Sequence, residues 1–306
     1  MHHAEKGEGV GLPIDALTRG DALSEMLASH LAAVSAVSDA QGSIDAAASH
    51  VASAVAAGAT LFYAAAGSSG LMALADASEL PGTFGVPAQQ IRICMAGGVP
   101  VDGVMPGDTE DGTDEAAKAA QSMQPQDLAI VVSASGTTPF AIAFAKAAKA
   151  QGARVVAIAN VADSPLLGLA DVAIALVTAA EVVDGSTRLG AGTAQKVALN
   201  MMSTQAGILL GHVHGGQMVN LVPDNIKLRH RARRIVAGIA AVHEAKAERA
   251  LERAGNDTKL AVLIATGLDI ETARGRLAQA GGRLRDCLPQ TTTKTNLSNE
   301  PTNQGS

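Results

Sequence analysis

Several residue types are scarce in this chain of 306 residues. Tryptophan is absent, aromatic residues make up 2% of the sequence, and the two cysteines, Cys94 and Cys287, lie far apart. Such a pair gives neither a disulfide framework nor the spacing of a metal site. The histidines share no ligand spacing either, so we expect no metal and no cofactor. No apolar run approaches the roughly 18 residues that suggest a membrane span.

Positive charge is scarce as well. The net charge is -6, and the single basic cluster, "KLRHRARR" at 227–234, reads best as the solvated face of a helix. A chain without a larger basic tract cannot neutralise many phosphates, which argues against nucleic acid as the main partner. The N-terminus lacks the apolar core of a signal peptide. We therefore expect a cytoplasmic protein with no nucleic-acid or membrane partner.

Short apolar runs alternate with helical stretches in the first two thirds of the chain. The runs at 60–65, 90–95, 128–133, 154–159 and 172–176 are mostly apolar. Strands of this kind are covered on both faces, as in a parallel sheet. Helices are predicted at 21–40, 43–58, 69–78, 112–122 and 139–151. The fold class is therefore α/β, a doubly wound parallel five-stranded sheet flanked by helices.

The rest of the chain has a different pattern. From about Thr187 onward it is expected to be helical throughout, with 259–288 forming three short helices broken at Gly267 and at Gly281-Gly282. The predicted organisation is a flexible N-terminus at 1–20, a ligand-binding α/β domain at 21–220, an all-helical C-terminal region at 221–288 and a disordered tail at 289–306.

Three hydroxyl-rich turns follow the sheet and precede helices: "AGSSG" (66–70), "SASGTTP" (133–139) and "DGSTRLGAGTAQK" (184–196). Ligands collect at the carboxyl ends of parallel strands, and helix N-termini with hydroxyls suit a phosphate. The alternative is that the turns serve only as helix caps. Neither nucleotide-binding fingerprint fits, so a phosphosugar is favoured. The candidate binding residues are Gly67, Ser68, Ser69, Ser133, Ser135, Thr137, Thr138, Ser186, Thr187 and Lys196.

Lys196 belongs to a polar face on an otherwise apolar helix. Thr193, Lys196, Asn200 and Ser203 share that face, which is either solvated or lines a polar cavity. The acidic residues are harder to assign. Asp76 and Glu79 share a helical face before "LPG", where the helix is expected to end, and a second group precedes the next helix: Asp108, Asp111, Asp114 and Glu115. The residue pattern leaves open which carboxylates are proton donors or acceptors and which complement a helix dipole.

Taken together, the motifs resemble those of the N-acetylmuramic acid 6-phosphate etherases, relatives of the sugar isomerase (SIS) domain proteins. The matching stretches include "LFYAAAGSSGLMALADASELPGTFG", "TEDG", "SASGTTPF" and "EVVDGSTRLGAGTAQKVALNMMST". The resemblance covers about 14–288. It implies a SIS-type sheet, a phosphosugar ligand held by the hydroxyl-rich turns, a helical C-terminal part and a homodimer.

The resemblance also implies a reaction. The lactyl ether of N-acetylmuramic acid 6-phosphate is cleaved without a metal, giving N-acetylglucosamine 6-phosphate and D-lactate in the recycling of cell-wall sugar. By position in the matched motifs, Glu79 is the acid and Glu110 the base. General acid–base catalysis of this kind contributes about 10²–10⁴-fold per group.

The sequence departs from the family pattern at three positions near the turns. Leu71 and Thr137 stand where the family has arginine, and Gly190 stands where it has lysine. A cation near phosphate contributes about 1.5–3 kcal/mol through charged hydrogen bonds. Two alternatives therefore stay open: a SIS-type enzyme on another phosphosugar, and a non-catalytic phosphosugar sensor. Retention of both glutamates favours an enzyme.

Overall fold

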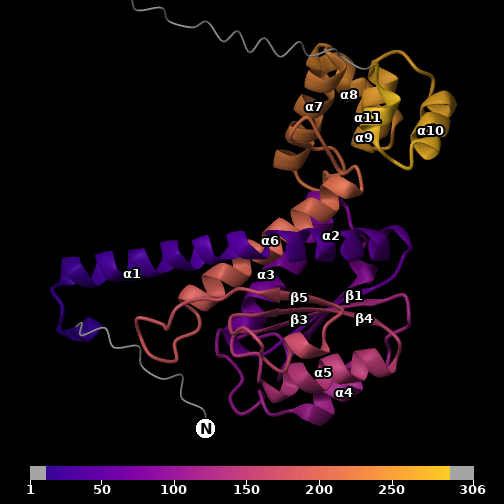
Figure 1. The fold of residues 1–306 in the computed structure, drawn as a ribbon. Coiled ribbons are helices and arrows are strands. Elements are labelled where there is room, and N and C mark those ends of the chain that lie inside the picture. Colours follow the sequence, from indigo (N-terminus) through magenta and orange to yellow (C-terminus); the bar gives the residue numbers. More distant parts are fainter. Residues whose placement is uncertain (1–11, 290–306) are drawn as a thin grey trace, which may run out of the picture. The chain divides into compact units, whose positions relative to one another are not determined.

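The computed structural model describes residues 12–289, which form two compact units divided after Leu228. Most of the predicted flexible N-terminus and nearly all of the predicted tail lie outside the described residues. A five-stranded parallel sheet forms the centre of the first unit (Figure 1), in the order β2-β1-β3-β4-β5. Its strands are β1 (Leu61–Ala65), β2 (Ile91–Met95), β3 (Leu128–Ser133), β4 (Arg154–Ala159) and β5 (Val172–Ala175). The predicted α/β class with five strands is confirmed.

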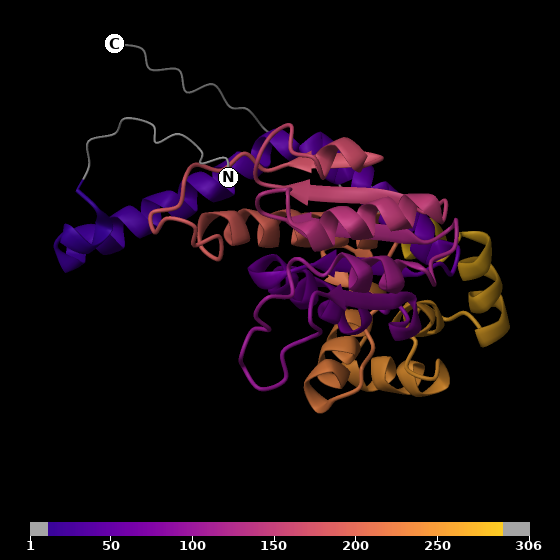
Figure 2. The same ribbon diagram turned by 90° about the horizontal axis from the view of Figure 1, so that it is seen from below.

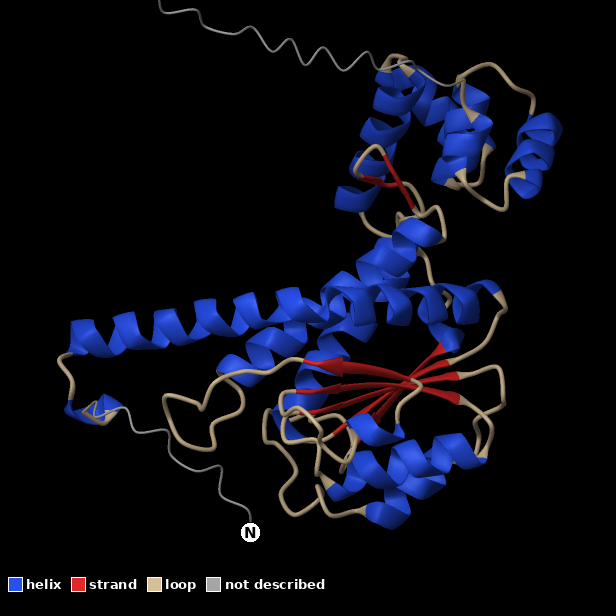
Figure 3. Cartoon of the chain, in the orientation of Figure 1, coloured by secondary structure: helices blue, strands red, loops and turns tan. Residues whose placement is uncertain are grey.

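Helices cover both faces of this sheet, as Figure 3 shows. They are α1 (Arg19–Ser35), α2 (Gln41–Ala56), α3 (Gly67–Phe84), α4 (Thr113–Ala120), α5 (Pro139–Ala150) and α6 (Gly190–Leu209). Successive strand residues point to opposite faces. Leu61 and Tyr63 therefore pack in one core with α2, α3 and α6, while Phe62 and Ala64 pack in a second core with α4 and α5. Figure 2 shows the same ribbon from below, with helices in front of and behind the sheet.

Helix α3 is longer than the sequence suggested. We expected it to end before Pro81, but it continues to Phe84. Leu80 and Phe84, one turn apart, are 3% and 6% exposed, so burial holds the last turn in place. Gly85 has φ 63° and its N–H donates to the carbonyl of Pro81, which ends the helix in a left-handed cap. Glu79 therefore lies within the helix.

The region after Thr187 is not helical throughout. Two short strands, β6 (Val213–His214) and β7 (Gln217–Met218), form an antiparallel hairpin through the left-handed Gly215 and Gly216. This turn chemistry favours a hairpin, and helical periodicity could not show it. Helix α7 (Ile226–Ala240) follows, and the second unit also contains α8 (Glu244–Arg253), α9 (Thr258–Ala265), α10 (Ile270–Gln279) and α11 (Leu284–Cys287). The predicted breaks at Gly267 and Gly281-Gly282 are confirmed.

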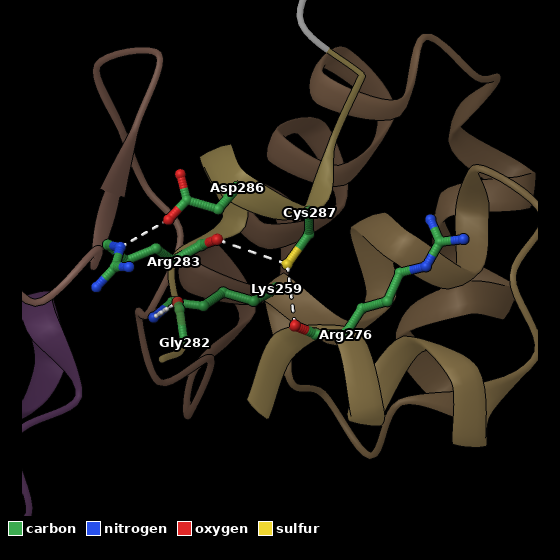
Figure 4. A network of polar contacts seen from close by, with 6 residues as sticks. All are labelled: Lys259, Arg276, Gly282, Arg283, Asp286 and Cys287. Carbon is green, nitrogen blue, oxygen red and sulfur yellow. Dashed lines mark hydrogen bonds and ion pairs between the residues drawn. The ribbon is translucent and has the colours of Figure 1, made fainter. Parts of the chain in front are cut away.

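A buried lysine links α9 to the turn that follows α10. Lys259, at the start of α9, is 5% exposed, and its ammonium donates to the carbonyl of Gly282 at 2.9 Å (Figure 4). Burial lowers the pKa of Lys259 to about 8. The thiol of Cys287 lies beside the carbonyls of Arg276 and Arg283 in the same network. These contacts tie α9 and α10 to the turn and short helix that follow.

Candidate functional site

The first hydroxyl-rich turn is the start of helix α3. Gly67 has φ 55° and lies two residues after the end of β1, so the first N–H groups of the helix lie at the carboxyl edge of the sheet. The residue before the helix, Ala66, offers no side chain to cap these groups. Ser68 is half-buried and Ser69 is buried. An uncapped helix start with two serines is suited to bind an anion.

Glu110 lies against this turn. A Cβ added to Gly67 would come within 2.7 Å of Oε1 of Glu110, so a larger residue here would displace the carboxylate. Glu110 is exposed, and its own backbone carbonyl accepts a hydrogen bond of 2.9 Å from the N–H of Phe140 in the first turn of α5. The structure therefore brings Glu110 and Gly67 together and fixes Glu110 to the start of a second helix.

The second turn is organised by its own hydroxyls. Ser133 is buried at the end of β3, and its Oγ lies 2.9 Å from Oγ1 of Thr138 and accepts from the N–H of Gly136. Oγ of Ser135 accepts from both the N–H and the hydroxyl of Thr137. Gly136 is left-handed, and a Cβ there would overlap Ser164. The turn is thus a fixed structure that exposes Ser135 and Thr137 to solvent.

The third turn differs from the first two, because its helix start is already occupied. The carboxylate of Glu181 accepts from the N–H of Gly190 at 2.8 Å and of Ala191 at 2.9 Å. A carboxylate at a helix N-terminus satisfies free N–H groups and complements the dipole. The start of α6 therefore holds the protein's own anion, which sequence reasoning missed. Glu181 and Gly190 are separated by a segment without helix or strand, and no local sequence pattern predicts a contact between its two ends.

This contact also describes the surroundings of one position at which the chain departs from the family pattern. A Cβ at Gly190 would lie 3.2 Å from Oε2 of Glu181. A lysine at position 190 would thus begin next to an anionic side chain of the protein, and its charge would be shared with Glu181. Ser186 is half-buried and Thr187 exposed in the segment before α6, where the carbonyl of Thr187 accepts from the N–H of Gly192.

The polar face of α6 has two parts. Asn200 and Ser203 donate to the buried carboxylate of Asp76 on α3, at 2.9 and 2.8 Å, and the hydroxyl of Tyr63 donates to it at 3.2 Å. Burial raises the pKa of Asp76, and the three hydrogen bonds act in the opposite direction. Lys196, in contrast, is exposed and lines a groove of about 620 Å³ beside α2. This face therefore forms both a buried network and part of a cavity wall.

Glu79 is exposed on α3, far from the start of the helix, where Glu110 lies against Gly67. It lies twelve residues after Gly67, and a rise of 1.5 Å per residue places it about 18 Å along the axis from the turn that Glu110 contacts. Asp76 and Glu79 lie three residues apart in α3, but Asp76 is buried and Glu79 is exposed. Within one chain, Glu79 lies far along α3 from the turn that Glu110 contacts, and Glu110 itself belongs to the connection between β2 and α4.

Residues 12–289 carry neither a metal cluster nor a membrane-spanning helix. No group of three or more His, Cys, Asp or Glu side chains in that range could hold a metal ion. None of its helices is both long and apolar enough to cross a membrane.

Comparison with known proteins adds independent findings. Residues 25–160 match the SIS domain family. A Mesorhizobium japonicum protein named N-acetylmuramic acid 6-phosphate etherase is 41% identical over 241 residues, which cover 77% of this chain and 78% of the relative. An Erwinia tasmaniensis protein of the same name is 38% identical over 280 residues, covering 90% and 92%.

A solved structure shares the fold at low sequence identity. The Escherichia coli CFT073 protein c3406, determined as a ligand complex, superposes with a TM-score of 0.50 and 16% identity. The match covers 65% of this chain and 97% of that chain. At this identity the likeness shows the SIS-type fold alone.

Proposed function

The chain belongs to the family of N-acetylmuramic acid 6-phosphate etherases, and from this premise we propose that it is an enzyme acting on that phosphosugar. It cleaves the D-lactyl ether and gives N-acetylglucosamine 6-phosphate and D-lactate. The observation that carries the proposal is the Glu110 carboxylate beside Gly67, at the uncapped start of α3. Proton removal from a bound sugar phosphate requires a binding site for the phosphate, such as a helix start, and a carboxylate close to that site.

In the proposed reaction, Glu110 takes the proton from C2 of the open-chain sugar. The C3–oxygen bond then breaks, and the departing lactate oxygen receives a proton from Glu79. Water adds to C3 of the unsaturated aldehyde and C2 regains a proton, so the net change is addition of one water across the ether. The serine and threonine hydroxyls of the first two turns hold the phosphate and sugar. These steps use only side chains of the protein and water, and they constitute a carbon–oxygen lyase mechanism.

The position of Glu79 bears on how many chains form one site. C2 and the ether oxygen are separated by two bonds, whereas Glu79 lies about 18 Å along α3 from the turn beside Glu110. One sugar cannot contact both side chains of one chain in this arrangement. We therefore propose a homodimer in which Glu79 of one copy serves the Glu110 of the other. A cytoplasmic location and a part in cell-wall sugar recycling belong to the same proposal.

The first experiment supplies N-acetylmuramic acid 6-phosphate in H₂¹⁸O and measures D-lactate and the mass of the sugar product. The expected result is lactate release with one solvent oxygen in N-acetylglucosamine 6-phosphate. If calorimetry shows that the sugar binds but no lactate is released, the protein would be a phosphosugar sensor and not an enzyme. Absence of both would mean that Leu71, Thr137 and Gly190 have changed the ligand, and other phosphosugars would then be assayed.

A second experiment tests the shared site. Glu79→Gln and Glu110→Gln are each expected to be inactive, but co-expression of the two variants forms mixed dimers with one intact site. Activity in purified mixed dimers, absent from either variant alone, is the expected outcome. Inactive mixed dimers would show that both glutamates must come from the same chain.

A further inference from the structure

The connection between β2 and α4 folds back on itself at Gly97. The N–H of Gly97 donates to both carboxylate oxygens of Glu115, at 3.3 Å each. Gly97 has φ 72°, and a Cβ there would lie 2.6 Å from side-chain atoms of Pro106 and of Thr109. The backbone at Gly97 therefore packs closely against residues that come shortly before Glu110. We call Gly97, Pro106, Thr109 and Glu115 the neck of the connection.

Glu110 lies inside the loop that the neck closes. Thr109 precedes it directly, and the carbonyl of Thr109 accepts from the N–H of Gly112 at 3.0 Å. Gly112 leads into α4, whose first turn carries the carboxylate of the neck. Both ends of the stretch 109–115 therefore meet Gly97, one through packing and the other through hydrogen bonds, with Glu110 between them.

The neck is also tied to the turn against which the Glu110 side chain lies. The N–H of Ala96 donates to the carbonyl of Ala65 at 3.0 Å, so the residue before Gly97 extends the pairing of β2 with β1. Ala65 ends β1 and lies two residues before Gly67, which is in contact with the Glu110 carboxylate. A displacement of Gly97 therefore changes where Glu110 lies relative to the start of α3.

We propose that Glu115 is a positioning residue for Glu110. Its carboxylate keeps Gly97 against Thr109, and this packing holds the Glu110 carboxylate beside Gly67. The effect on the reaction rests on the proposed function, whereas the placement of Glu110 can be measured without substrate. Glu115 is exposed, so its hydrogen bonds add little to the stability of the whole fold. Their contribution is local, because proton transfer depends on how closely the base is held to its productive position.

The alternative role of Glu115 is to complement the dipole of α4. Asp114 lies beside it in the same first turn and carries the same charge, so it would share that role. Of these two carboxylates, that of Glu115 accepts from Gly97. Asp114→Ala is therefore a control that matches Glu115→Ala in both charge and helix position.

The first test is kinetic. Glu115→Ala should lower kcat about 10-fold, because a small displacement of the base slows proton removal. KM should change less than about two-fold, since the start of α3 is unaltered. Glu115→Gln should keep most of the wild-type kcat, because its amide oxygen still accepts from Gly97. Asp114→Ala should keep wild-type kcat and KM. Equal losses for Glu115→Ala and Asp114→Ala, or for Glu115→Ala and Glu115→Gln, would overturn the proposal.

A double-mutant cycle tests whether Glu115 acts through Glu110. In a Glu110→Gln background the base is already lost, so adding Glu115→Ala should lower kcat no further. A further loss in that background would contradict the proposal, because Glu115 would then act on a group other than the base.

The last measurement needs no substrate. The N–H of Phe140 donates to the carbonyl of Glu110, so its hydrogen exchange reports on the backbone position of Glu110. In Glu115→Ala this proton should exchange at least about 10-fold faster than in wild type, and in Asp114→Ala at the wild-type rate. Unchanged exchange in Glu115→Ala would overturn the proposal whatever the substrate. Faster exchange in a protein whose wild type releases no lactate would support the placement of Glu110 by the neck and contradict only the proposed function.

Discussion

Helices α3 and α6 both begin after turns rich in glycine and hydroxyl residues. They differ in whether a side chain of the protein caps their first N–H groups. The start of α3 has no side-chain cap and lies beside the exposed Glu110. The start of α6 is filled by the carboxylate of Glu181, which takes two of its N–H groups. A helix start is a site for an external anion only when the protein leaves it open. The comparison therefore supports the proposal that the phosphate binds at the start of α3, and it indicates a structural role for the start of α6.

The largest effect is expected at the carboxylate beside the open helix start. Glu110→Gln should lower kcat by about 10²–10⁴-fold, because the amide cannot accept the C2 proton. Deuterium exchange at C2 of the sugar, followed by NMR, should be lost as well. Asp111→Asn, at the exposed neighbouring position, is the matched control and should keep near-normal activity. Normal exchange in Glu110→Gln would exclude this residue as the base.

The next effect concerns the glycines at the two helix starts. Gly67→Ala should lower kcat/KM by about 100-fold, because the new Cβ displaces Glu110 by a distance that matters for proton transfer. Gly190→Ala should change kcat/KM much less, since Glu181 is not expected to touch the substrate. Gly168→Ala, where an added Cβ meets nothing within 4 Å, controls for the substitution itself. Equal losses at Gly67 and Gly190 would remove the distinction between the two helices.

Removing the Glu181 side chain should leave the start of α6 without a cap, like the start of α3. Glu181→Ala removes two hydrogen bonds at the N-terminus of α6, and loss of such a cap costs about 1–2 kcal/mol of unfolding free energy. Denaturant unfolding measures this change, with Glu271→Ala at an exposed position of α10 as control. The variant should also be stabilised more than wild type by added inorganic phosphate, which can enter the vacated position. Unchanged stability would show that water replaces the carboxylate at no cost.

The smallest effect is expected for Asp76, whose buried carboxylate links α3 to α6. Burial raises the pKa of Asp76 in the folded state, so the folded protein holds this proton more tightly than the unfolded chain. The stabilising contribution is therefore present at low pH and is lost as pH rises through the folded pKa, by at most about 1.4 kcal/mol per pH unit. Asp76→Asn cannot titrate, so its stability deficit relative to wild type should narrow from about pH 4 toward neutrality. A deficit independent of pH would mean that Asp76 has an ordinary pKa.

Sequence reasoning succeeded where local pattern determines structure. Mostly apolar runs predicted all five strands, and glycine breaks predicted the three last helices. Sequence reasoning did less well at the site. The residue pattern did not decide among the carboxylates of the two acidic groups, and only family resemblance pointed to Glu79 and Glu110; their roles stay predictions. The contact of Glu181 with Gly190 and the burial of Asp76 depend on how distant segments meet, and periodicity along one segment carries no such information.

The backbone hydrogen bond between Glu110 and Phe140 affects where the sequence of this protein can vary. Between β2 and α4 the chain runs through 96–112 without a helix or strand, and Val101 and Val104 are 96% and 67% exposed in this segment. The segment is fixed near its far end, where the carbonyl of Glu110 meets Phe140. Insertions and substitutions around 99–104 can therefore accumulate without moving the backbone of Glu110. The first half of this connection can thus vary in length and sequence while its second half keeps its place.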